Sequence, residues 1–598
     1  MRSLFVISAL LGGFTFWILA SPSQEEAKYV GQEQCSSCHP TITENFEQVG
    51  MARTFQPIGD ALPIEDWNEN NSYYHQPSNQ HFLMTSREGR FFQKRYQLDK
   101  GGDEINALEV EIQFALGSGL KERDYAAHLP GGELVQMPVV WYSDEGIWSI
   151  APGYDLANHD GFRRRINYRC IFCHASYPDL ADNQGKYEVQ TALFEEGVSS
   201  GIDCERCHGP GSLHVKHAMS GLGSGAVRDS IVNPARLDRN RQMDVCLQCH
   251  LETTSAPLPN STLKLSRSVF SFRPGETLKD YAVYFDFPEG VGHDDDFNIV
   301  HQGYQLTRSA CFKNSNMTCL SCHDPHRIPD EPESFFRGKC LECHDNESCA
   351  LEAGSRQANG DNCVSCHMPQ RRTDDIVHVV MTDHYIRRSV PEDLLSPIEE
   401  KDNRGYRGNL KFYLPEENEK LYMGMGLARG PDLVQGVEML ETAIKSDEPK
   451  TAEPYFYLAS AYEKLERSNQ AIKYYRKVLE IDPIYAEAYY NLGLIYLGNK
   501  QLETALQLFQ ESIRLQPRRG DSHIVIGVAL TQLDRLEEAR RAYFKALELD
   551  PLNVLALNNL GLLALQTENK ALAIGYFKRV LRVEPSDSNA REMLKRLE

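Results

Sequence analysis

The chain is poor in basic residues and in long apolar runs, and its last third contains no cysteine. Lys and Arg total 63 against 84 Asp and Glu, so the formal net charge is −21, which argues against nucleic acid as a partner. Beyond the N-terminal stretch, no segment is apolar enough to span a bilayer. Because no cysteine follows Cys366, thiol chemistry is confined to residues 35–366.

The N-terminus carries the one long apolar run. Arg2 precedes an uncharged stretch of 17 residues that ends at Ala20, and a polar segment begins at Ser21. This order predicts a signal peptide over residues 1–20, cleaved after Ala20. An uncleaved anchor is the alternative, because Ile18 stands where a small residue is expected. We therefore expect an exported protein, periplasmic or at the cell surface, which meets the membrane only if the segment is uncleaved.

Fourteen of the sixteen cysteines follow one pattern, in which two cysteines separated by two residues precede a histidine. In c-type haem attachment, two thiols reach the vinyl groups on one edge of a porphyrin and the adjacent imidazole binds the iron. Zinc ribbons do not need a histidine after each cysteine pair. The pattern predicts seven covalent haem c groups, each with its iron. The haem-binding cysteines are Cys35, Cys38, Cys170, Cys173, Cys204, Cys207, Cys246, Cys249, Cys319, Cys322, Cys340, Cys343, Cys363 and Cys366, and the proximal iron ligands are His39, His174, His208, His250, His323, His344 and His367.

The two remaining cysteines, Cys311 and Cys349, lie outside every motif. In an oxidising compartment they can form a disulfide if they lie within reach of each other, or remain buried as free thiols. The sequence leaves both alternatives open.

The second axial ligand decides whether a haem carries electrons or does chemistry. Eleven histidines lie outside the motifs in the haem region, enough for two histidines on every iron. His214 and His326 follow short rigid spacers after their own motifs and are expected to serve a neighbouring haem. The predicted distal ligands are His75, His159, His214, His293, His326, His378 and His384, with His81, His128, His217 and His301 in reserve.

The cysteine-rich region, 28–390, is predicted to be one cytochrome c domain. From Cys35 to His367 there are 333 residues for seven motifs, too few for one domain per haem. We expect a mainly α domain of short helices and loops around a shared core. The alternating sequence at about 72–150, with turns at Glu88-Gly89 and before Gly146, predicts a small antiparallel β insertion. A charged linker is expected over 391–415.

The last part of the chain repeats every 34 residues. The period appears in prolines and alanines, namely Pro449, Pro483, Pro517, Pro551 and Pro585, with Ala471, Ala505, Ala539 and Ala573. This segment, 416–598, resembles the tetratricopeptide repeat family. The resemblance implies an all-α solenoid with four clear units over 452–585, a degenerate unit before them and a capping helix after them. Such a solenoid has a concave face for a protein or peptide; alternatively, it packs on the haem region or self-associates.

The haem region resembles exported multihaem cytochromes, in the grouping of the tetrahaem cytochrome of nitrifiers, hydroxylamine oxidoreductase and the pentahaem nitrite reductase. The resemblance rests on the seven motifs, on the stretch from Cys207 to His214 and on Cys322-His-Asp-Pro-His326. It implies haems stacked in close pairs. No Cys-x-x-Cys-Lys occurs, and no tyrosine matches the crosslinking one of hydroxylamine oxidoreductase, so the resemblance favours an electron carrier over an enzyme.

The leading hypothesis is therefore an exported cytochrome that transfers electrons along seven haems to a redox partner protein, with no catalytic residue, while its repeats dock a protein. The enzyme alternative is an oxidoreductase that reduces a small nitrogen or sulfur compound at one open haem. A third alternative is an assembly scaffold in which the haems are structural.

Overall fold

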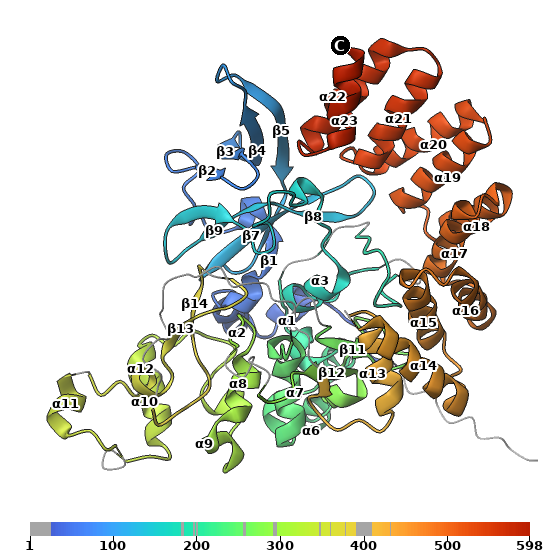
Figure 1. Cartoon of the computed structure of the whole chain (residues 1–598). Coiled ribbons are helices and arrows are strands. Elements are labelled where there is room, and N and C mark those ends of the chain that lie inside the picture. The colour runs from blue at the N-terminus through green and yellow to red at the C-terminus, as the bar shows by residue number, and fades with distance from the viewer. Residues whose placement is uncertain are drawn as a thin grey trace, which may run out of the picture.

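The computed structural model describes residues 26–598 apart from 181–183, 195–197, 199–200, 255–258, 291–295, 346–348, 359, 377, 390–409 and 431. The predicted signal peptide and most of the predicted linker lie outside the described residues. In Figure 1 an N-terminal region of sheets and short helices stands beside a helical solenoid. Among the described residues, no helix is both long and apolar enough to cross a membrane.

Two antiparallel sheets occupy residues 55–150. One contains, in spatial order, β1 (Phe55–Pro57), β6 (Phe114–Leu116), β7 (Glu122–His128), β9 (Val139–Tyr142) and β10 (Ile147–Ile150), with β8 (Leu134–Gln136) also paired to β7. The other is a meander of β2 (Ser72–His75), β3 (Gln80–Arg87), β4 (Arg90–Leu98) and β5 (Glu104–Ile112). Glu88 and Gly89 have positive φ between β3 and β4, as the hairpin prediction requires.

This β part is larger than predicted, so "mainly α" holds for the solenoid more than for the N-terminal region. The sheets begin at Phe55 rather than near residue 72. Pro138 separates β8 from β9, because proline has no N–H to donate to a strand ladder. A buried apolar cluster that includes Trp67, Trp141 and Trp148 holds the layers together.

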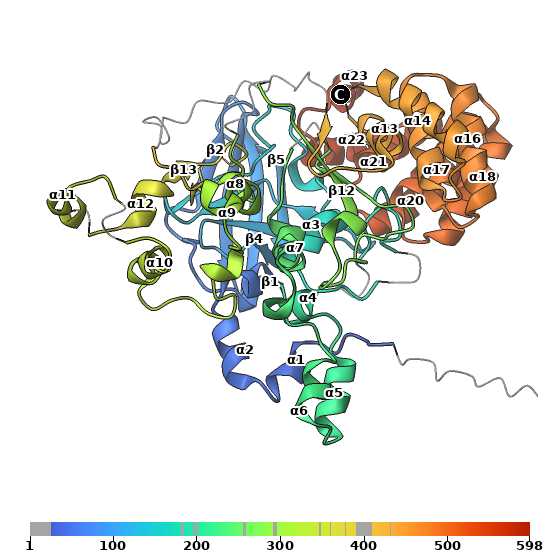
Figure 2. The same ribbon diagram turned by 90° about the horizontal axis from the view of Figure 1, so that it is seen from below.

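Short helices carry the cysteine motifs, as expected, and the fifth motif begins on a short 3₁₀ helix, Cys319–Ser321. The helices before residue 300 are α1 (Gln32–Ser36), α2 (Pro40–Phe46), α3 (Tyr168–His174), α4 (Glu205–His208), α5 (Ser212–Met219), α6 (Ser224–Arg228) and α7 (Arg239–His250). Those after it are α8 (Gln302–Arg308), α9 (Ala310–Lys313), α10 (Pro332–Leu341), α11 (Ala353–Ala358) and α12 (Cys363–His367). Small ladders join β11 (Ser261–Leu263), β12 (Ala282–Asp286) and β15 (Lys411–Phe412), and pair β13 (Gln370–Arg372) with β14 (Val380–Thr382). Figure 2 shows α1 and α2 beside α5 and α6 at one end of the molecule.

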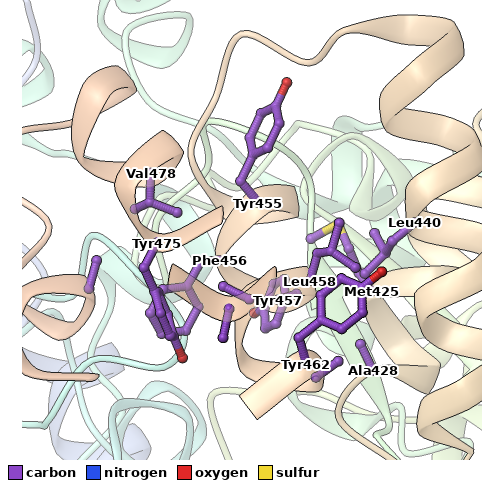
Figure 3. Packing of buried hydrophobic residues seen from close by; sticks show 14 of the residues in the cluster. Met425, Ala428, Leu440, Tyr455, Phe456, Tyr457, Leu458, Tyr462, Tyr475 and Val478 are labelled. Atoms are coloured by element: carbon purple, nitrogen blue, oxygen red, sulfur yellow. The ribbon is translucent and has the colours of Figure 1, made fainter. Parts of the chain in front are cut away.

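The solenoid is built from antiparallel helix pairs. They are α13 (Glu419–Leu427) with α14 (Leu433–Asp447), α15 (Glu453–Lys464) with α16 (Ser468–Ile481), α17 (Ala486–Gly498) with α18 (Leu502–Leu515), α19 (Gly520–Gln532) with α20 (Leu536–Leu549), and α21 (Val554–Gln566) with α22 (Lys570–Val583), followed by α23 (Ser588–Leu597). Figure 3 shows Leu458 of α15 packed near Met425 and Leu440 of the preceding pair. A Cβ on Gly561 would lie 2.8 Å from the Phe577 ring, which explains why glycine recurs where the helices of a pair meet.

The turns between solenoid units contact the N-terminal region. Acidic residues at the same place in three units, Asp482, Asp550 and Glu584, form ion pairs with Lys186, Arg165 and Arg163, respectively. Tyr187 stacks on Tyr485, with ring centroids 3.8 Å apart. Of the alternatives for the repeats, packing on the N-terminal region is therefore observed along this edge of the solenoid.

Candidate haem-binding core

All seven cysteine motifs line one continuous cavity. Its volume is about 3290 Å³, and its lining includes every motif histidine and every motif cysteine except Cys170. A pocket for one small ligand measures roughly 300–1,000 Å³, so this cavity has room for several large cofactors. The shared core expected from the motif spacing is thus a single space.

Each motif forms one helical turn. The His39 N–H donates to the Cys35 carbonyl oxygen at 2.9 Å, and His323 bonds to Cys319 in the same way at 2.9 Å. In a helical turn, residues i, i+3 and i+4 share one face, so both thiols and the imidazole point the same way. Side-chain caps start two of these turns: Asn167 accepts from Cys170 N at 3.1 Å and Asn362 from Ser365 N at 3.1 Å.

Hydrogen bonds orient several motif imidazoles. His208 Nδ1 lies 2.8 Å from the Val232 carbonyl oxygen, and His367 Nδ1 lies 2.7 Å from that of Arg387. His250 Nδ1 lies 3.2 Å from Gln302 Oε1. A donor–acceptor pairing at Nδ1 selects the tautomer whose Nε2 is free to bind a metal.

Three motif histidines face a second histidine across the cavity. The ring centroids of His39 and His214 are 6.4 Å apart with an interplanar angle of 20°, those of His208 and His326 are 6.0 Å apart at 22°, and those of His323 and His384 are 6.1 Å apart at 29°. In each pair the second histidine comes from a different motif's neighbourhood.

The spacing of these pairs fits two imidazoles on one metal ion. Metal–nitrogen bonds of about 2.0–2.1 Å, with each nitrogen about 1.1 Å from its ring centre, place two ring centres about 6.3 Å apart. Burial lowers the pKa of His384 to about 4, with His323 contributing, and burial also lowers the pKa of His208 and His323. These rings are therefore neutral at pH 7, which is the form that binds metal.

The structure does not bring the other predicted distal ligands to the cavity. His75 and His159 lie against each other, with ring centroids 5.2 Å apart, and His159 packs on Tyr154 in the β part. His378 pairs with Glu145 at 3.0 Å. None of these three lines the cavity. The spacing of residues along the chain could not show that these histidines would lie in or against the β part. His293 lies outside the described residues.

Four motif histidines, His174, His250, His344 and His367, have no comparable partner ring among the described residues. The reserve histidines do not fill these places: His128 Nε2 lies 2.8 Å from the Phe194 carbonyl oxygen, and His81 stacks on Tyr96. Neither His217 nor His301 lines the cavity. Cys311 and Cys349 do line it, as free thiols.

Thiols of different motifs interact across the cavity. Such interactions join Cys35 with Cys204, Cys173 with Cys249, Cys246 with Cys319, and Cys340 with Cys363. Cys207 also lies near Cys249, and Cys322 near Cys340. The motifs are therefore contiguous from the first to the last.

Family models identify the solenoid. Tetratricopeptide repeat models match residues 452–485, 474–507 and 524–590. The solenoid is a tetratricopeptide repeat domain. Similar solved structures include "MamA 41-end from Desulfovibrio magneticus RS-1", 23% identical over 29% of this chain and 98% of that one with a TM-score of 0.27, and "Crystal structure of YrrB: a TPR protein with an unusual peptide-binding site", 20% identical over 29% and 90% with a TM-score of 0.27.

The chain is also distantly similar to multihaem cytochromes. It is 20% identical over 406 residues to the dissimilatory sulfite reductase MccA of Wolinella succinogenes, covering 58% of this chain and 52% of the relative. It is 20% identical over 228 residues to the multiheme cytochrome MtrA of Shewanella baltica, covering 36% of this chain and 56% of the relative. The chain thus spans about half the length of these curated relatives. The repeats and the cytochrome-like region agree with the resemblance expected from the sequence.

Proposed function

We propose that the protein is an exported cytochrome that binds seven haems c and conducts electrons along them. The observation that carries the proposal is the single cavity of about 3290 Å³ into which all seven motifs open. Haem c supplies one-electron redox chemistry when bound. The residues around the cavity attach, orient and enclose the cofactors.

In this proposal the fourteen motif cysteines hold the haems and the seven motif histidines bind iron. Each thiol adds across a vinyl group and its proton passes to the vinyl carbon, so attachment needs no external oxidant. His214, His326 and His384 would supply the second iron ligand to the haems held by His39, His208 and His323, respectively. Ligands that come from another motif's neighbourhood tie the turns together, which favours a rigid chain of cofactors.

The contacts between motif thiols support a route for electrons. Neighbouring motifs follow the order first, third, fourth, fifth, sixth and seventh. The second motif lies beside the fourth. Haems attached at these motifs would form a chain from Cys35–His39 at one end to Cys363–His367 at the other, with the second motif as a side branch.

Export and a protein partner belong to the same proposal. The predicted signal peptide over residues 1–20 supports export to the periplasm or the cell surface, which is consistent with haem c attachment. The tetratricopeptide repeats bind a redox partner protein through the helices that the docked turns leave uncovered, because the turns at Asp482 and Asp550 already contact the N-terminal region.

A reductase acting at one open haem is the second candidate function. It is favoured by the four motif histidines without a facing histidine among the described residues, and one relative is named as a sulfite reductase. In this case the substrate is a small nitrogen or sulfur oxyanion that binds iron directly.

The test is a haem count by mass together with an electron paramagnetic resonance spectrum of the purified oxidised protein. Seven haems with only low-spin signals, unchanged by nitrite, sulfite or carbon monoxide, support conduction. A high-spin haem that responds to one of these ligands favours the reductase. A protein that carries no covalent haem after expression with a cytochrome c maturation system refutes both.

A further inference from the structure

Three of the motif turns meet through equivalent residues. The residue before the second cysteine is Phe172 in the second motif, Arg206 in the third and Gln248 in the fourth. Arg206 Nη2 donates to the Phe172 carbonyl oxygen, and Gln248 Nε2 donates to the Arg206 carbonyl oxygen at 3.3 Å. The three residues are 2%, 1% and 6% exposed, respectively. This junction therefore lies inside the protein.

Arg206 brings a buried positive charge to the junction. Its guanidinium carbon lies 4.3 Å from the centre of the Phe172 ring and 4.5 Å from that of Tyr177. Two of its nitrogens, Nε and Nη1, are buried without a hydrogen-bond partner. A buried cation is unfavourable unless negative charge or electron density lies within reach.

The nearby carboxylates are engaged with the main chain. Asp203 Oδ1 accepts from Glu205 N at 3.1 Å and from Arg206 N at 3.2 Å. Glu205 accepts from Gly31 N at 2.8 Å and from Gly211 N at 2.7 Å. The other groups that interact with the guanidinium are the thiols of Cys173 and Cys249 and the phenols of Tyr177 and Tyr281. The cation thus faces attachment points of two other haem sites.

We propose that Arg206 raises the reduction potentials of the three haems bound at Cys170–His174, Cys204–His208 and Cys246–His250. The inference rests on the proposed haem loading. Reduction of an iron removes one positive charge, so a fixed cation beside it favours the reduced state. The effect is strong here because the site excludes water and the local dielectric constant is low. The junction is then where electrons reside while the outer haems exchange them with partners.

The test is a potentiometric titration of the loaded Arg206→Gln protein, followed by optical and paramagnetic resonance spectra. Three of the seven potentials are expected to fall, while Arg206→Lys, which keeps the charge, retains them. Arg241→Gln is the matched control, because it removes the same charge from an α7 side chain that is 50% exposed. Equal shifts in Arg206→Gln and Arg241→Gln, or no shift in Arg206→Gln at full haem content, overturn the inference.

A second variant covers the case in which Arg206→Gln does not load haem. Asp203→Asn removes a negative charge near the same guanidinium while leaving an oxygen that can accept from the main chain. Above pH 7, where this carboxyl is ionised, the same three potentials are expected to rise, together with that of the first haem, whose Cys35 also interacts with Asp203. Constancy of the three potentials refutes the inference. A wild-type protein without haem refutes the proposed function instead, so the two failures are distinguishable.

Discussion

Replacing His214 by alanine removes the imidazole that faces His39, at a centroid distance of 6.4 Å. If His214 is the distal ligand of the first haem, that iron loses one of its two strong-field ligands and becomes high-spin, while the other six do not change. The low-spin intensity of the oxidised protein should fall by the share of one haem, with one new high-spin signal that binds carbon monoxide once reduced.

The fold should tolerate this change. His214 lies on α5, a helix of eight residues with no buried residue, and its Nδ1 lies 2.9 Å from the Val227 carbonyl oxygen. Loss of such a hydrogen bond lowers the free energy of unfolding by about 1 kcal/mol. His217→Ala is the matched control, because His217 lies on the same helix and does not line the cavity. An unchanged low-spin intensity in His214→Ala, or the same high-spin signal in His217→Ala, would refute the pairing.

Three further substitutions test the fold around the core. Arg95→Met removes hydrogen bonds to the carbonyl oxygens of Arg582 and Val583 at the end of α22, and should lower the free energy of unfolding by about 3 kcal/mol in denaturant titrations. Gly561→Ala places a Cβ 2.8 Å from the Phe577 ring, and the thermal midpoint should fall with a loss of about 1–3 kcal/mol. Burial, with smaller contributions from neighbouring cations, lowers the pKa of His159 to about 4. Protons therefore bind the unfolded chain preferentially, so the free energy of unfolding falls as the pH drops from about 6.5 to 4. His159 accounts for about 2 kcal/mol of this loss at pH 5. His159→Gln should abolish that part of the pH dependence in urea unfolding.

Each of these has a control within the chain. Replacing Arg87, whose side chain is 54% exposed beside Glu109, by methionine should leave stability nearly unchanged, because a solvated ion pair contributes little. A Cβ on Gly498 meets nothing within 4 Å, so Gly498→Ala should not destabilise. His81→Gln is the matched histidine control for His159→Gln, because His81 lies on β3 and stacks on Tyr96. If a control variant changed stability as much as the variant it is paired with, the contact assigned to that residue would be contradicted.

The repeat period predicts which solenoid residues share an edge, but it does not predict which residues of the N-terminal region they contact. The 34-residue interval places Asp482, Asp550 and Glu584 at the same turn of three units, so they follow one edge of the solenoid. Nothing in the interval indicates that Lys186, Arg165 and Arg163 lie opposite. Those partners come from segments about 300 to 420 residues away, and only the packed chain brings them together.

The sequence by itself determined the features that depend on neighbours along the chain. The motif Cys-x-x-Cys-His is one helical turn, and the repeat reflects helix pairs of constant length, so both could be predicted without tertiary contacts. Tertiary structure decided which histidine faces which: His214 opposite His39, His326 opposite His208, and His75 and His159 inside the β part. It also decided that Phe172, Arg206 and Gln248 meet. These are contacts across a cavity between distant segments, and the spacing of residues along the chain carries no information about direction in space.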